Sequence, residues 1–206
     1  MLCSVGLSAY RDTSWELDRR VTGTPFAVVA LARIRKLAGW HVKVLATQEA
    51  RGGEGYGQLQ AALGSVGLSV EPVIIPTGTT REEIFQIVEK VIDCVPPRSR
   101  VILDITQALR HLPFTLFTAL VYLTVYSGIE LEGVYSGAFE APGEHKPIVD
   151  LTSLFELSSW FHALQSVQDT GSVKAALRMF NLENSRLGRE RGGENPLSKF
   201  KRPLPS

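Results

Sequence analysis

The segment Val101-Ile-Leu-Asp-Ile-Thr-Gln-Ala-Leu-Arg-His-Leu-Pro-Phe114 decides the fold class, because it joins an apolar run, a polar turn and the start of a second apolar stretch. Residues 101–105 have the length and composition of a buried strand. Residues 112–127 are apolar on nearly every side, which predicts a helix buried on both faces. A strand that passes through a polar turn into a buried helix is typical of α/β proteins.

Strands and helices alternate on both sides of this segment. The pattern favours an α/β fold: a Rossmann-like, mostly parallel sheet with helices on both faces and a short C-terminal helical extension. The strand order 3-2-1-4-5 is common in such folds. The predicted strands are 2–7, 42–46, 70–75, 101–105 and 129–137, with a short strand at 148–150.

Local signals predict where several helices begin and end. Thr24 and Pro25 predict a helix start, with Thr24 as the N-cap and Pro25 in the first turn. Thr80 and Glu83 have the spacing of a capping box in front of an amphipathic stretch. The glycines between residues 52 and 57 predict a loose loop before a weaker helix over 56–63.

The chain is expected to have three parts: a Rossmann-like domain over 1–165, a helical extension over 166–183, and a flexible tail or linker over 184–206. The tail has six basic and two acidic residues, so it carries +4, whereas the whole chain carries +1. The remainder therefore carries −3. A protein body that grips long nucleic acid by its phosphates would be more basic, so we expect no such binding there.

Composition narrows the class further. With 44% hydrophobic and 21% charged residues, the 206-residue chain matches soluble globular proteins. The longest apolar stretch, 112–126, is too short to span a bilayer of about 30 Å, and no signal peptide is recognised, so a cytoplasmic protein is expected. Cys3 and Cys94 are predicted to be small buried hydrophobes. We expect neither metal nor cofactor, because metal-ligand spacing is absent around the four histidines, His41, His111, His145 and His162.

Two polar loops should meet where the order 3-2-1-4-5 reverses. The first, Gly6–Ser14, offers hydroxyls, an aromatic ring and one cation, and an ordinary polar turn between strand and helix also fits it. In the second, Asp104 ends an apolar strand and is followed by Thr106, Gln107 and Arg110. One interpretation is a phosphate site at the start of the next helix, with Arg110 as its cation. The other makes Asp104 and Thr106 helix caps and Arg110 a surface charge.

Beyond these signals, the chain resembles CRISPR-associated proteins with a CARF (CRISPR-associated Rossmann fold) domain, specifically the DxTHG-motif group. The family motif Asp-x-Thr-His-Gly-x-Arg is matched by Asp104-Ile-Thr-Gln-Ala-Leu-Arg110. Other segments fall in the family's order within residues 1–164: 4–10, 24–26, 46–50, 75–78, 112–114, 134–140 and 148–152.

The resemblance implies a homodimer that binds cyclic oligoadenylate, the second messenger of type III CRISPR antiviral signalling. The expected ligand is cyclic tetra-adenylate, lying across the two-fold axis so that each half meets the same loops. Ser8, Ala9 and Tyr10 are assigned to one wall of the site, and Gly137 to its border. The residues assigned to the phosphate-facing floor are Thr106, Gln107, Ala108 and Arg110.

The chain departs from the family in two places. Gln107 and Ala108 stand where the motif has His and Gly, and glutamine cannot titrate near pH 7. After Leu164 the helical ribonuclease motif of effector members, an Arg and a His four to six residues apart, is not found. We therefore expect a stand-alone sensor or a sensor module with a fused or separate effector.

Three functions stay open: a sensor, a ring nuclease, and an unrelated nucleotide-binding Rossmann-like regulator. In the nuclease a ribose 2′-OH attacks the adjacent phosphate without a metal and leaves a 2′,3′-cyclic phosphate, with Ser8, Gln107 and Arg110 as its catalytic residues. A homodimer is expected even without ligand, because apolar residues are abundant in and after the fifth strand: Tyr135, Phe139, Phe155, Trp160 and Phe161.

Overall fold

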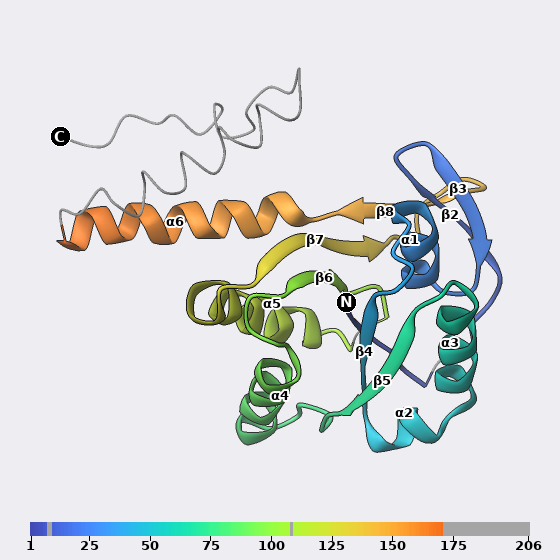
Figure 1. Cartoon of the computed structure of the whole chain (residues 1–206), viewed down its shortest axis with the longest axis horizontal. Helices are drawn as coiled ribbons and strands as arrows, with labels where there is room; N and C mark the ends of the chain where they lie inside the picture. The colour runs from blue at the N-terminus through green and yellow to red at the C-terminus, as the bar shows by residue number, and fades with distance from the viewer. Residues whose placement is uncertain (8–9, 108, 171–206) are drawn as a thin grey trace. The chain divides into compact units, whose positions relative to one another are not determined.

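The computed structural model describes residues 1–7, 10–107 and 109–170, so the helix predicted at 172–182 and the tail at 184–206 lie outside it. A compact unit spans Met1–Thr152, and a second unit starts at Ser153; the boundary expected at residue 165 stays a prediction. The first unit holds an eight-stranded sheet in the order β3-β2-β8-β7-β6-β1-β4-β5 (Figure 1). The strands are β1 Leu2–Ser4, β2 Thr13–Leu17, β3 Arg20–Thr24, β4 His41–Ala46, β5 Ser69–Ile74, β6 Arg100–Asp104, β7 Glu130–Gly137 and β8 Lys146–Asp150.

Five parallel strands confirm the predicted arrangement. β1 lies between β4 and β6, with Cys3 opposite Val44 and Leu2 opposite Leu103. β5 flanks β4, and β7 flanks β6. The order β5-β4-β1-β6-β7 is therefore the expected 3-2-1-4-5, and the fold class is confirmed. β1 is shorter than predicted, because the chain leaves the sheet after Val5 donates its N–H to Leu45 O.

The antiparallel hairpin of β2 and β3 is absent from the sequence-based prediction. β2 pairs in parallel with β8, which runs antiparallel to β7. The hairpin turn places Asp18 and Arg19 at φ of 52° and 62°, without the Asn-Gly or Asp-Gly pair that usually signals such a turn. The predicted helix start at Thr24 is wrong: Thr24 ends β3, and α1 (Ala27–Arg35) begins after Phe26.

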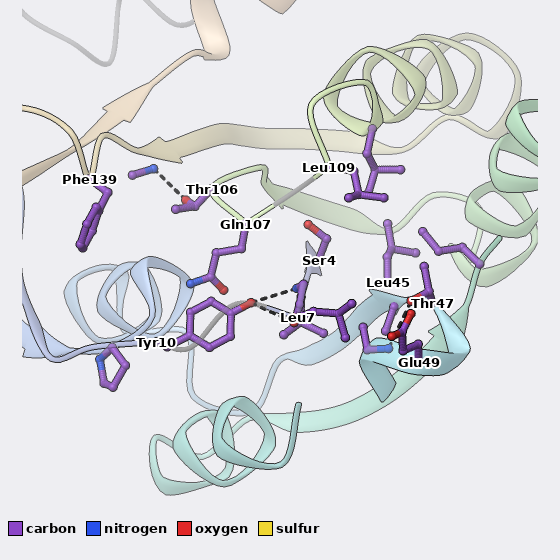
Figure 2. Close-up of a pocket in the computed structure, with 18 of the residues that line it drawn as sticks. Ser4, Leu7, Tyr10, Leu45, Thr47, Glu49, Thr106, Gln107, Leu109 and Phe139 are labelled. Carbon is purple, nitrogen blue, oxygen red and sulfur yellow. Dashed lines mark hydrogen bonds between the residues drawn. The ribbon is translucent and has the colours of Figure 1, made fainter. Parts of the chain in front are cut away.

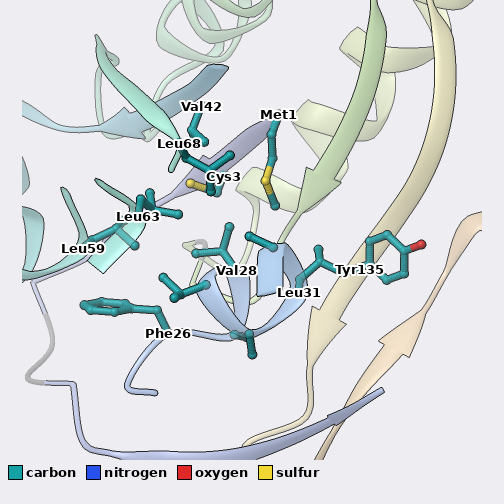
Figure 3. Close-up of a cluster of buried hydrophobic side chains, with 14 of the residues drawn as sticks. Met1, Cys3, Phe26, Val28, Leu31, Val42, Leu59, Leu63, Leu68 and Tyr135 are labelled. Atoms are coloured by element: carbon teal, nitrogen blue, oxygen red, sulfur yellow. The ribbon is translucent and has the colours of Figure 1, made fainter. Parts of the chain in front are cut away.

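One face of the sheet is covered by α1 and α3 (Glu54–Ser65), which share a core with β1 and β4 (Figure 3). Cys3, Leu31 and Leu63 are fully buried there. The loose loop predicted over 52–57 is wrong, because α2 (Gln48–Gly52) is followed directly by α3. The buried side chains of α3, such as Leu63, offset the low helix propensity of its glycines.

The other helices of the first unit, α4 (Arg81–Cys94) and α5 (Leu112–Tyr122), lie on the opposite side of the sheet (Figure 1). Thr80 Oγ1 accepts the Glu83 N–H at 3.2 Å, which confirms the predicted cap. α5 continues into a π-helix, η1 (Leu123–Ser127). The prediction that this stretch is buried on both faces is wrong, because Phe114 is 78% exposed and Tyr126 is 75% exposed.

Cys3 is buried as predicted, whereas Cys94 is only half-buried. α6 (Thr152–Thr170) begins at the predicted Thr152, whose N–H donates to Asp150 Oδ1 at 2.9 Å. None of the helices in the described ranges combines the length and the apolar character that crossing a membrane requires.

Candidate functional site

A cavity of about 750 Å³ opens at the carboxyl ends of the parallel strands, where the strand order reverses (Figure 2). We call it the carboxyl-end cavity. Segments that follow β1, β4, β5, β6 and β7 all contribute to its lining. Its volume lies in the range that accepts a small organic ligand. The two loops singled out from the sequence, after β1 and after β6, meet here.

The loop after β1 brings Tyr10 and Arg11 to the cavity. The Tyr10 hydroxyl accepts the Gly6 N–H at 2.9 Å and donates to Gly6 O at 3.3 Å. The Tyr10 ring packs against Phe26 with the ring centroids 4.7 Å apart, and burial raises the pKa of the phenol. The loop is not the turn between strand and helix that was considered, because it leads into β2. Ser8 and Ala9 lie outside the described residues.

The turn after β6 is held by a short chain of hydrogen bonds. Thr106 Oγ1 donates to Asp104 Oδ1 at 2.5 Å and accepts the Gly137 N–H at 2.7 Å. Asp104 is only 1% exposed, and burial raises its pKa to about 7 in spite of the hydrogen bonds from Thr106. The capping interpretation is wrong, since α5 begins only at Leu112, after His111. Thr106 and Gly137 both line the cavity.

The charged groups at the cavity differ from those expected. Arg110 is exposed, lies two residues before α5, and is not among the described lining residues. Arg11 from the first loop and Glu49 from α2 line the cavity instead. The sequence contained a signal for Arg11, since it is the one cation of the first loop. Ala108 lies outside the described residues.

Two polar atoms at the cavity have no hydrogen-bond partner among the described residues: Ser4 Oγ and Gln107 Oε1. Ser4 is 3% exposed at the end of β1. An unpaired buried polar atom costs about 1–3 kcal/mol, and folded proteins pair nearly all of them. Ser4 Oγ and Gln107 Oε1 are therefore polar atoms at the cavity that the described residues leave without a hydrogen bond. Sequence reasoning missed Ser4, although it is the polar residue of an otherwise apolar strand.

The remaining lining is largely aromatic and aliphatic. Trp15 of the hairpin is 1% exposed, and its ring centroid lies 6.4 Å from that of Phe139, which is 51% exposed. Trp15 Nε1 donates to Thr24 O at 2.9 Å, which fixes the indole. Together with Tyr10, these rings form apolar walls suited to a flat ligand group. The described part of the chain contains no cluster of three or more His, Cys, Asp or Glu side chains that could hold a metal ion.

Comparison with known proteins gives one informative similarity. The chain is 26% identical over 119 residues to CRISPR-associated protein MJ1674 of Methanocaldococcus jannaschii. The match covers 55% of this chain and 19% of that protein, so the chain spans about a fifth of the relative's length. No model of a protein family matches the chain. The similarity supports a connection with CRISPR-associated proteins.

Proposed function

We propose that this chain is a dimeric sensor that binds cyclic oligoadenylate, with cyclic tetra-adenylate as the expected ring, in type III CRISPR antiviral signalling. The carboxyl-end cavity carries the proposal, because it joins the loop after β1 to Thr106 and Gln107 where the strand order reverses. The similarity to a CRISPR-associated protein supports the part of the proposal that places the chain in a CRISPR pathway.

The charge of the cavity indicates how an anionic ring would lie. Arg11 and Glu49 contribute one charge of each sign to the described lining, and most of the rest is apolar. A mostly apolar interior suits bases better than phosphates, because an unpaired charge is costly to bury. The phosphates would then lie at the mouth, within reach of the Arg11 guanidinium.

The dimer contact is assigned to α5 and η1. The stretch from Leu112 to Ser127 contains no charged residue, yet it exposes large apolar side chains. Exposed apolar patches of this kind mark interaction surfaces, and an isologous interface suits a symmetric ring. Tyr135, which entered the sequence-based dimer prediction, is 3% exposed in the core and cannot contribute. The exposed side chains are Phe114, Tyr122, Val125 and Tyr126.

The ligand is tested by calorimetry with cyclic tri-, tetra- and hexa-adenylate, followed by chromatography of the recovered ligand. A sensor should bind the tetra-adenylate ring tightest and return it intact. Absence of binding to all three rings would overturn the proposal and favour an unrelated nucleotide-binding regulator.

The dimer is tested by light scattering at micromolar concentration. The wild type should be a dimer and Tyr126→Glu a monomer. Val21→Glu, at an exposed apolar residue of β3, is the matched control and should stay dimeric. A monomeric wild type, or a dimeric Tyr126→Glu variant, would contradict the assignment.

The presence of Glu49 at the cavity favours ring cleavage as the second candidate function. In such a step the ribose 2′-oxygen bonds to phosphorus, and the 5′-oxygen leaves and takes a proton from water, giving a 2′,3′-cyclic phosphate and a 5′-hydroxyl. Glu49 would take the 2′-OH proton, and Arg11 would stabilise the charge on the phosphate. We expect slow opening of tetra-adenylate in EDTA, and a further loss of about 10²-fold or more in Glu49→Gln. Rapid multiple turnover or strict dependence on a divalent ion would exclude this mechanism.

A further inference from the structure

We propose that Gln107 is the residue that selects adenine, by pairing its carboxamide with the amino group and the neighbouring ring nitrogen of one base. The inference rests on the proposed function, since it names the part of the ring that enters the carboxyl-end cavity. Gln107 lines this cavity, and its Oε1 is buried and has no hydrogen-bond partner among the described residues.

The chemistry of the missing partner narrows the ligand group. Oε1 is an acceptor and needs an N–H or O–H donor. A phosphate offers oxygen acceptors only, so it cannot satisfy this atom. Adenine carries an amino donor beside the N7 acceptor, and one carboxamide matches both. On the edge that carries N7, guanine and hypoxanthine present an oxygen acceptor in place of the amino group, so pairing at this edge would leave Oε1 unpaired.

The surroundings of Gln107 suit a flat base. Figure 2 shows its side chain extending toward Tyr10. The Tyr10 hydroxyl is engaged on both sides by Gly6, so the tyrosine offers its ring rather than a competing donor. Phe139 adds an exposed ring to the same lining. Stacking on such rings tolerates any base, so discrimination between bases falls to hydrogen bonds.

The backbone before Gln107 is held in place, which a selecting residue requires. Thr106 is tied both to the buried Asp104 and to the Gly137 N–H of β7. A histidine, which stands here in the family motif, presents its donor and its acceptor on different sides of the ring and titrates near pH 7. Glutamine presents both groups side by side and keeps them at every pH. Selection of adenine is therefore expected from the glutamine of this chain and not from the histidine of the family motif.

The test compares cyclic tetra-adenylate with the same ring carrying hypoxanthine, using calorimetry. The wild type should prefer the adenine ring roughly ten- to a hundredfold. Gln107→Met should reduce this preference to about threefold or less. The matched control is Gln58→Met on α3. The exposed Gln58 donates from Nε2 to Glu54 Oε1 at 2.7 Å, and its replacement should keep the wild-type preference.

The outcomes separate this inference from the proposed function. Equal affinity of the wild type for the two rings, or an undiminished preference in Gln107→Met, would overturn the role of Gln107 and leave ring binding intact. Failure of the wild type to bind either ring would overturn the proposed function and this assignment with it. If Gln107→Met does not fold, Gln107→Glu replaces it; this variant accepts from the amino group but cannot donate to N7, so its preference should be intermediate.

Discussion

The first unit has a cavity at each end of its parallel strands, and the two differ in how their polar groups are matched. The amino-end cavity, of about 540 Å³, is lined by Trp40, Lys43, Arg98 and Arg100 among others. Lys43 Nζ lies 2.6 Å from Glu71 Oε2, and Arg100 pairs with Glu132 while its guanidinium lies over the Trp40 ring. The carboxyl-end cavity is less charged, yet Ser4 and Gln107 are unmatched there.

Charge and volume alone therefore do not identify a ligand site. Basic groups that are already paired within the protein, as Lys43 and Arg100 are, gain little from a ligand, because the existing partners would have to be displaced. An unpaired buried atom gains a hydrogen bond without losing one.

Asp104→Asn tests the buried carboxyl beneath the carboxyl-end cavity. Burial raises its pKa from 3.8 to about 7, so the folded state binds this proton more tightly than the unfolded chain. The resulting stabilisation is fully present below pH 3.8 and is lost as the pH rises through 7, a loss of roughly 4 kcal/mol. Urea denaturation should show the wild type losing about this much stability relative to Asp104→Asn between pH 4 and pH 8. Parallel pH profiles would contradict it.

Arg11→Ala should weaken binding of cyclic tetra-adenylate by about 1.5–3 kcal/mol, as for a lost charge-assisted hydrogen bond. Arg98→Ala, in the amino-end cavity, should change the affinity by less than about 0.5 kcal/mol, as for an ordinary surface substitution. Arg110→Ala should cost less than Arg11→Ala. Calorimetry measures all three, and a larger loss in Arg110→Ala would restore the sequence-based phosphate cation.

Gly137→Ala in the carboxyl-end cavity is compared with Gly39→Ala in the amino-end cavity. A Cβ at Gly137 would lie 2.5 Å from Trp15 Cζ3 and 2.8 Å from Ala27 Cβ, so we expect a loss of about 1–3 kcal/mol of stability and weaker ring binding. Gly39 faces open space but has a φ of +86°, so Gly39→Ala should cost roughly 1–2 kcal/mol through its backbone alone. Ring affinity distinguishes them, since Gly39→Ala should keep it; equal losses would argue against a site at Gly137.

Ser4→Ala gives the smallest effect but the clearest sign. It removes an unpaired buried hydroxyl, so stability should rise by about 1 kcal/mol while ring affinity falls by a similar amount. Ser99→Ala in the amino-end cavity removes a hydroxyl that donates to Pro96 O at 2.6 Å, and should instead lower stability by about 0.5–1.5 kcal/mol. Thermal denaturation measures both variants, and the same sign in both would remove the distinction between the cavities.

The parallel half of the fold and the two loops that meet at the carboxyl-end cavity could be predicted from the sequence. Apolar runs predicted β1, β4, β5, β6 and β7, and the signal is most continuous in β1, β4 and β6, whose residues are mostly buried. Thr80 capped α4 as predicted, because a cap depends on residues only three apart. Tyr10, Thr106, Gln107 and Gly137, which the resemblance assigned to a ligand site, all line the carboxyl-end cavity, whereas Arg110 is not among its described lining residues.

The hairpin, the charged lining of the carboxyl-end cavity and its unpaired atoms depend on contacts between segments that are distant in the sequence. β2 is held by β8, more than a hundred residues away in sequence, through backbone pairing that leaves no local pattern. Arg11 reaches the cavity because its loop crosses toward that hairpin instead of entering a helix. Whether Ser4 and Gln107 find partners depends on which groups surround them once the chain has folded, and composition and spacing carry no record of that.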